Sequence, residues 1–392
     1  MANDHTPKIG LTTAIIIGMN AMIGAGIFTA PAAIGTYVGP AGIVAYLFVI
    51  CAVWFIAQSL ARVAALFPQE GSFYAYAKQW GGRMVGIIAG YSYLIGLLIA
   101  MGLLAQGAGD YLHDPFFPGI SETTLGLITL FLLIFLNMFG VILSQLGQQI
   151  LICTTTFPLI ATTIMCFSKA QLANLTPFAP YGLRNVLQAT REVIFGFFGF
   201  ECASSLFTIV KNPQKNVPRA LTYSIVIVGA LYLLFVTSII ASTPLNLFIN
   251  PRIALPVVLQ TVFPDNQWIL TAIHISILSA IVGTIHSMIW SSSALMISLF
   301  KQIHSINLNQ KIAVLLVGFF ILLSFIFLKN IYLFFSLTAI FIILSYMLSI
   351  ISLLTMKKEW KNGQNIITVG ALCSATIIFY FALERVIQHW RF

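Results

Sequence analysis

The chain has 392 residues, of which 59% are hydrophobic and only 7% are charged. Soluble domains carry about 25% charged residues, so this composition excludes a protein that must cover a water-facing surface. The mean hydropathy of +0.98 points the same way. The net charge of +9 is basic enough for nucleic-acid binding, but no nucleic-acid-binding motif accompanies it. The composition therefore predicts a polytopic membrane protein that contacts the lipid bilayer.

Long apolar runs follow one another along the chain, separated by short polar segments. Because about 20 apolar residues span a bilayer as a helix, these runs predict eleven transmembrane helices. They lie roughly at residues 12–35, 40–66, 85–109, 122–142, 147–168, 187–209, 219–241, 267–299, 312–328, 331–355 and 365–387. Barrel strands would be shorter and would alternate in polarity. The predicted fold is all-α, a membrane helix bundle forming one domain over residues 1–392.

The distribution of Lys and Arg between the loops predicts the orientation. With a cytoplasmic N-terminus, twelve of the 19 basic residues fall on the cytoplasmic side and seven on the other, as the positive-inside rule requires. An odd number of helices then places the C-terminus in the periplasm of an inner-membrane protein. The five cysteines lie within apolar runs and have neither metal-site nor disulfide spacing. We expect no metal and no cofactor.

Glycine-rich stretches interrupt the first and the sixth apolar runs. The first contains "GMNAMIGAGIF" over residues 18–28, and the sixth contains "FGFFGFE" over residues 195–201. Because glycine weakens a helix, both helices are predicted to be discontinuous. Two interrupted helices in corresponding positions of two halves are typical of transporters with inverted repeats. The predicted repeats cover about residues 8–170 and 187–355, and the helix at 365–387 follows them.

The break in the first helix can bind a ligand through its backbone. The N–H groups that begin a half-helix suit a carboxylate, and the carbonyl groups that end one suit an ammonium group. The break can therefore hold both ends of an amino acid without a charged side chain. The candidate binding residues are Ile23, Gly24, Ala25, Gly26 and Ile27. The alternative is that these small residues only permit close helix packing, and the sequence leaves both open.

Glu201 is the acidic residue that lies deepest in any predicted span. A carboxyl group inside the membrane is costly and usually functional, so Glu201 is a candidate proton carrier, cation partner or conformational switch. The alternative is a protonated side chain that bonds a neighbouring helix. Phe195 and Phe198 flank the same break, where their rings can gate a cavity or meet a cation, or simply pack.

Histidine and serine side chains mark the eighth span. His274 and His286 can titrate or bind substrate inside the membrane, or they can bond a neighbouring helix in the neutral form. The hydroxyls of Ser291 to Ser293 can help to coordinate sodium or can join helices. No nucleophile is paired with a base, so we do not expect an enzyme.

Three stretches resemble the amino acid–polyamine–organocation (APC) superfamily of transporters. "IGMNAMIGAGIFTAPA" is similar to the first helix of that superfamily, and "FPQEGSFYAYAKQWGG" is similar to the segment between its second and third helices. In the latter, Glu70 stands where the family usually has glycine. "FGFECASSLFTIVKNPQKNVPRAL" resembles the sixth helix and the loop after it. The likeness covers roughly the first 220 residues, and the rest matches only in hydropathy.

The resemblance implies a five-plus-five inverted repeat with discontinuous helices 1 and 6, and secondary transport of an amino acid or amine by alternating access. It implies that residues 23–27 bind the substrate, that Phe195 and Phe198 line or gate the site, and that Glu201 couples transport to protons. His286 falls near another aromatic position of the family's site. The closest subgroup is that of the basic amino acid and polyamine antiporters.

Two departures from the family pattern affect these expectations. The fifth run, "QQILICTTTFPLIATTIMCF", lacks the lysine that many proton-coupled members carry there, and its threonines before Pro158 are more similar to the exchangers. Most members also have twelve helices, so the oligomeric state stays open. The expected transporter is an exchanger or proton-coupled permease with a small-molecule substrate. A sodium-coupled symporter of the same fold, a channel and an intramembrane enzyme are the alternatives.

Overall fold

A computed structural model provides the structure of the chain. It describes residues 9–24, 26–67, 72–139, 145–201, 210–248, 255–355 and 364–390. These residues are almost entirely helical and contain no β-strand, although one isolated β-bridge joins Ile9 to Val210. The predicted all-α class is thus confirmed.

The helices follow the predicted apolar runs closely. The α-helices are α1 (Leu11–Met22), α2 (Gly26–Tyr37), α3 (Gly42–Leu66), α4 (Ser72–Phe116), α5 (Glu122–Met138), α6 (Gln145–Ser168), α7 (Leu183–Gln188), α8 (Thr190–Phe195), α10 (Pro213–Ser242), α11 (Leu255–Val262), α12 (Gln267–Leu299), α13 (Gln310–Phe327), α14 (Ile331–Thr355) and α15 (Gln364–Trp390). Short 3-10 helices are η1 (Gly39–Ala41), η2 (Leu172–Leu175) and η4 (Leu245–Leu247), and η5 (Phe300–His304) is a π-helix.

Seven helices in the described part of the chain are long and apolar enough to cross a membrane: α3, α4, α10, α12, α13, α14 and α15. The shorter apolar helices α1, α5 and α6 occupy three further predicted runs. The sixth run contains α8 and the turns that follow it, while its residues 202–209 lie outside the described residues. The chain is therefore a multi-pass membrane protein with a helix-bundle fold.

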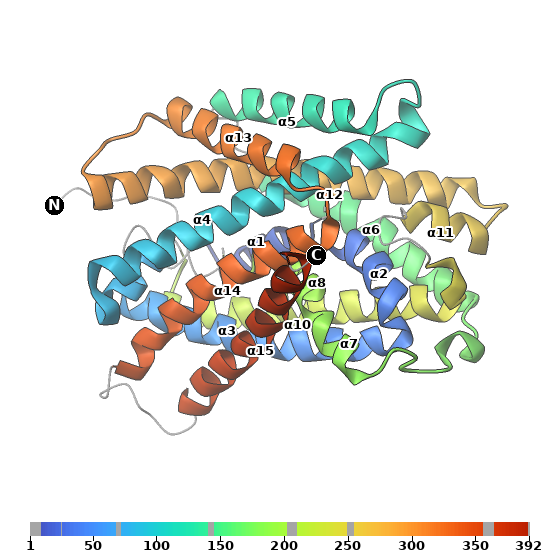
Figure 1. The fold of residues 1–392 in the computed structure, drawn as a ribbon, viewed down its shortest axis with the longest axis horizontal. Helices are drawn as coiled ribbons and strands as arrows, with labels where there is room; N and C mark the ends of the chain where they lie inside the picture. The colour runs from blue at the N-terminus through green and yellow to red at the C-terminus, as the bar shows by residue number, and fades with distance from the viewer. Residues whose placement is uncertain are drawn as a thin grey trace.

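The interrupted helices lie in the middle of the bundle. Figure 1 shows α1 and α8 at the centre, with α5 and α13 along one edge and α3 and α15 toward the opposite edge. The long helices enclose them: α14 packs on α4 and α15, α10 packs on α1 and α3, and α12 packs on α4 and α6. The two breaks are thus surrounded by protein, where freed backbone groups do not face lipid.

Local sequence signals set the ends and bends of several helices. The Ser121 hydroxyl accepts a hydrogen bond from the Thr124 N–H at 3.2 Å and caps α5. The Asn309 side chain does the same for α13, accepting from the Lys311 N–H at 2.9 Å. Such caps satisfy N–H groups that have no partner within the helix. Gly82, with a φ of 70°, bends α4 just before the predicted run that begins at residue 85.

Many hydroxyl groups in the spans bond within their own helix. The hydroxyls of Ser291 and Ser293 donate to the carbonyls of Met288 and Ile289, at 3.2 and 2.7 Å. Thr163 donates in the same way to the carbonyl of Leu159 at 2.7 Å. This back-bonding is common where serine or threonine sits inside a helix. For Ser291 and Ser293, the hydroxyl protons are therefore used locally.

Candidate substrate site

The first helix is broken where the glycines predicted. Ile23 leaves the helical conformation with φ −75° and ψ 81°, and α2 starts again at Gly26. Two N–H groups close the end of α1, because Ile23 donates to the Met19 carbonyl and Gly24 donates to the Met22 carbonyl, both at 2.8 Å. The predicted site residue Ala25 lies outside the described residues.

The sixth helix is also interrupted as predicted. The helix α8 ends at Phe195, and turns continue to Glu201. Gly199 adopts a φ of 111°, which side chains with a Cβ rarely adopt. A Cβ at this position would also collide with the carbonyl oxygen of Ala21 in α1. The glycine is therefore required twice, by its own backbone conformation and by its contact with the first helix.

The two breaks meet backbone to backbone. A Cβ built on Gly26 would lie 2.6 Å from the Cα of Gly196 and 3.0 Å from its nitrogen. A Cβ on Gly196 would instead lie 3.5 Å from a ring carbon of Tyr232 and 3.6 Å from the carbonyl carbon of Gly26, which are ordinary distances. The close approach thus depends on the missing side chain of Gly26.

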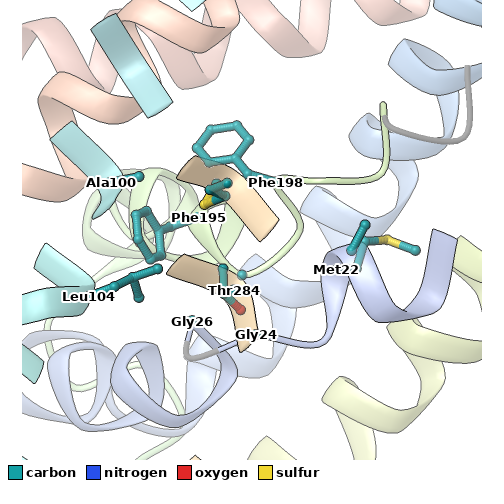
Figure 2. Close-up of a pocket in the computed structure, with 11 residues that line it drawn as sticks. Met22, Gly24, Gly26, Ala100, Leu104, Phe195, Phe198 and Thr284 are labelled. Carbon is teal, nitrogen blue, oxygen red and sulfur yellow. The ribbon is translucent and has the colours of Figure 1, made fainter. Parts of the chain in front are cut away.

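A small pocket lies at this junction. Its lining residues come from α1, α2, α4, α12 and the broken sixth helix: Ala21, Met22, Gly24, Gly26, Ala100, Leu104, Phe195, Gly196, Phe198, Thr284 and Met288. Figure 2 shows Ala100, Leu104 and Phe195 on one side, with Thr284 beside the two glycines. The pocket is therefore built around exposed backbone and apolar side chains.

Four of the predicted site residues line this pocket, namely Gly24, Gly26, Phe195 and Phe198. The predicted residues Ile23 and Ile27 are buried beside it but do not line it. The absence of a side chain at Gly24 allows α12 to pack closely here. A Cβ at this position would lie 2.6 Å from the Thr284 hydroxyl oxygen.

The structure adds residues that no sequence signal marked. Ala100 and Leu104 line the pocket from α4, and Thr284 and Met288 line it from α12. Each pair is four residues apart, so both members lie on one face of their helix. An alanine or leucine in an apolar run looks the same whether it faces lipid, core or pocket, and only the packing of the helices distinguishes them.

Glu201 lies next to the pocket and does not line it. Its side chain is 2% exposed. One carboxyl oxygen accepts a hydrogen bond from the Tyr93 hydroxyl at 2.6 Å, and the other accepts from the Gly199 N–H at 3.0 Å. The ring centroid of Phe73 lies 4.3 Å from that of Tyr93 and 5.6 Å from that of Tyr346. We call Phe73, Tyr93, Glu201 and Tyr346 the Glu201 cluster.

His286 faces a neighbouring helix. Its Nδ1 atom lies 2.9 Å from the side-chain nitrogen of Asn137 in α5, and His286 is not among the residues that line the pocket. His274 contacts the ring of Tyr111 with the ring centroids 6.3 Å apart. The geometry of His286 fits the alternative in which a histidine joins two helices.

A second buried acidic residue was missed by the sequence analysis. Glu192 lies near the start of the predicted run 187–209, beside polar residues, and α8 carries it into the bundle, where it is fully buried. The Nε atom of Arg191 donates to its carboxyl group at 2.8 Å, and the Arg191 guanidinium lies 5.9 Å from the centroid of the Tyr37 ring. Tyr332 stacks edge-on against Tyr37 at 5.7 Å. We call Tyr37, Arg191, Glu192 and Tyr332 the Arg191 cluster.

Within the described residues, no group of three or more His, Cys, Asp or Glu side chains is arranged to hold a metal ion. The chemistry available at the pocket is thus backbone hydrogen bonding, one threonine hydroxyl and apolar contact. Such a site can bind and position a small molecule, and it offers no nucleophile activated by a base.

Comparison with known proteins identifies the family. The family model for amino acid permeases matches residues 9–387. An uncharacterized transporter of Mycobacterium tuberculosis is 26% identical over 303 residues, which cover 76% of this chain and 66% of the relative. The branched-chain amino acid permease BcaP of Bacillus subtilis is 22% identical over 314 residues, covering 75% of this chain and 67% of the permease. The alignments thus span about two thirds of these relatives.

A third relative and a solved structure extend the comparison. The methylthioribose transporter of Bacillus subtilis is 25% identical over 236 residues, covering 56% of this chain and 51% of the transporter. The crystal structure of MhsT in complex with L-phenylalanine superimposes with a TM-score of 0.62 at 15% identity, covering 94% of this chain and 98% of MhsT. At this identity the likeness concerns the fold, and it extends over nearly the whole of both chains.

Proposed function

The protein belongs to the amino acid permease family, and we propose that it is a secondary transporter that carries an amino acid across the membrane by alternating access. The observation that carries this proposal is the pocket where the two interrupted helices meet. Transporters of this architecture bind substrate at such breaks, near the middle of the membrane. Binding there would shift the bundle between states open to either side.

We assign both charged ends of the amino acid to the backbone. The first turn of α2 has N–H groups that point along the helix axis, and with the helix dipole they favour a carboxylate. The carbonyl groups at the end of α1 would accept the ammonium group. The Met22 carbonyl is already engaged, because it accepts from the Tyr232 hydroxyl at 2.7 Å and from the Gly24 N–H at 2.8 Å. The ammonium group is therefore assigned to the other carbonyl groups at this end of α1. The proposed substrate-binding residues are Ile23, Gly24, Ala25, Gly26, Ile27, Phe195 and Phe198.

We assign proton coupling to Glu201. Its identified hydrogen-bond partners, the Tyr93 hydroxyl and the Gly199 N–H, are neutral donors. Protonation would convert the carboxyl from an acceptor into a donor and so alter both bonds. Because Gly199 belongs to the second break, such a change would alter the backbone next to the pocket. We assign His286 to the α5–α12 contact and not to the substrate.

The proposed location is the inner membrane, with the N-terminus in the cytoplasm and the C-terminus in the periplasm. The distribution of Lys and Arg between the loops supports this orientation. In this orientation α2 runs from the pocket toward the periplasm, so the Arg191 cluster lies at the periplasmic end. The Glu201 cluster then lies on the cytoplasmic side of the pocket.

Flux into proteoliposomes tests the proposal. We expect uptake of a labelled amino acid that saturates with concentration and accelerates when unlabelled substrate is present inside. Imposed proton and sodium gradients, applied separately, identify the coupling ion. Flux that rises linearly with concentration would indicate a channel, and chemical conversion of the labelled compound would indicate an enzyme. Either result would overturn the proposed transport function.

A further inference from the structure

The side chains that line the pocket carry no charge. Among the lining residues, Thr284 is the only one whose side chain has a hydroxyl, amide, imidazole or charged group, and the others are glycine, alanine, leucine, methionine or phenylalanine. Ala25 and residues 202–209, which lie outside the described residues, contain no charged residue in the sequence either. The substrate side chain would therefore meet an apolar wall.

The two buried carboxyl groups near the pocket are already engaged. Glu201 accepts hydrogen bonds from Tyr93 and Gly199, and Glu192 is bound by the Arg191 guanidinium. Neither is among the lining residues. A substrate with a second ammonium group would bury that charge without a counter-charge, which is strongly unfavourable. An acidic side chain would meet the same penalty, since no Lys or Arg is among the described residues that line the pocket.

Resting on the transport function proposed above, we propose that this pocket selects α-amino acids with an uncharged, apolar side chain and rejects basic amino acids and polyamines. This departs from the sequence likeness to the antiporters of basic amino acids and polyamines. The reason is that α4 and α12 supply part of the pocket lining. Their lining residues lie outside the three sequence stretches that resemble the superfamily.

The same residues set the size of the accepted side chain. Ala100 and Leu104 present one small and one large group from a single face of α4, and Met288 adds a flexible apolar group from α12. Methionine adapts to side chains of different shape, whereas the methyl group of Ala100 has no alternative rotamer. Ala100 and Leu104 are therefore the specificity-determining residues of the site.

Competition against labelled leucine in proteoliposomes tests the substrate class. Alanine, valine, leucine and methionine should reduce uptake, whereas lysine, arginine, putrescine and glutamate should leave it unchanged even at 100-fold excess. Competition by lysine or putrescine comparable with that by leucine would overturn the selectivity and keep the transport function. If no amino acid or amine is taken up at all, both the selectivity and the transport function fail.

Two substitutions test the assigned residues. Ala100→Leu should lower the ratio of leucine to alanine uptake about tenfold or more, since a few methylene groups in a fitted pocket discriminate by such factors. Leu104→Ala should raise the ratio of leucine to alanine uptake, because it makes room for a larger substrate side chain. The ratio is internal to each variant, so differences in protein level cancel. Leu103→Ala, which truncates a buried neighbour outside the pocket, is the control. Unchanged ratios in both pocket variants would overturn the assignment.

Discussion

Two buried glutamates flank the pocket along the sixth helix and are held in opposite ways. Glu192, before the break, is bound by the guanidinium of Arg191 at 2.8 Å. Glu201, after the break, accepts from the neutral hydroxyl of Tyr93 at 2.6 Å and from a backbone N–H. The Arg191 cluster thus compensates a charge with a charge, whereas the Glu201 cluster surrounds a carboxyl group with neutral donors and aromatic rings.

The difference indicates two different roles. A carboxylate paired with arginine stays ionised, because losing the charge would leave the arginine buried alone. A carboxyl group among neutral donors has no such constraint, so it can gain or lose a proton during a transport cycle. We therefore expect substitutions in the Arg191 cluster to act on folding and substitutions in the Glu201 cluster to act on coupling.

The largest effect is expected for Arg191→Leu. This change leaves Glu192 buried without its partner, which typically lowers the free energy of unfolding by about 3–5 kcal/mol. Thermal denaturation of the purified protein in detergent measures the loss. The double variant Arg191→Leu/Glu192→Leu is the matched control and should recover much of it, because it removes both charges. Equal stability of the single variant and the wild type would contradict a structural ion pair.

The next effect concerns pH. Glu201→Gln should fold and keep substrate binding, but its uptake should lose the pH dependence of the wild type, because the amide cannot exchange a proton. Uptake is measured in proteoliposomes over a range of external pH. A pH profile that is the same in the variant and the wild type would rule out Glu201 as the coupling group.

A smaller effect is expected for Tyr93→Phe. The carboxyl of Glu201 then loses a hydroxyl donor, which should lower the free energy of unfolding by about 1–3 kcal/mol. Tyr76→Phe removes the hydroxyl of another buried tyrosine of α4 and serves as the control. In the Glu201→Leu background the cost of Tyr93→Phe should shrink, because the partner is gone. Additive effects would show that the two side chains are not coupled.

The sequence allowed the helix bundle and both breaks to be predicted, because the signals were local. Long apolar runs indicate helices that span the membrane. Glycine indicates positions where a helix is weak or where another backbone comes close. The φ of Gly199 and the contact between Gly26 and Gly196 are the physical causes of the pattern that was visible.

The rest depended on packing between distant segments. Thr284 reaches the pocket because α12 packs beside the first break. The sequence drew attention to His286, two residues further on, and did not mark this threonine. Glu192 was hidden because a charged pair beside polar residues is typical of a loop, whereas α8 turns inward and buries the pair. His286 has the chemistry of a site residue, and its contact with Asn137 is visible only in three dimensions.

The most direct test of the account is leucine binding to purified glycine variants, measured by isothermal titration calorimetry. Gly26→Ala places a methyl group 2.6 Å from the Gly196 backbone, so the two breaks must separate and binding should be lost. Gly196→Ala meets only ordinary contacts and should weaken binding far less. Gly107→Ala, a glycine of α4 whose Cβ would be 3.7 Å from its nearest neighbour, controls for the added methyl group. Leucine binding by Gly26→Ala with the affinity of the wild type would contradict a site at the junction of the two broken helices.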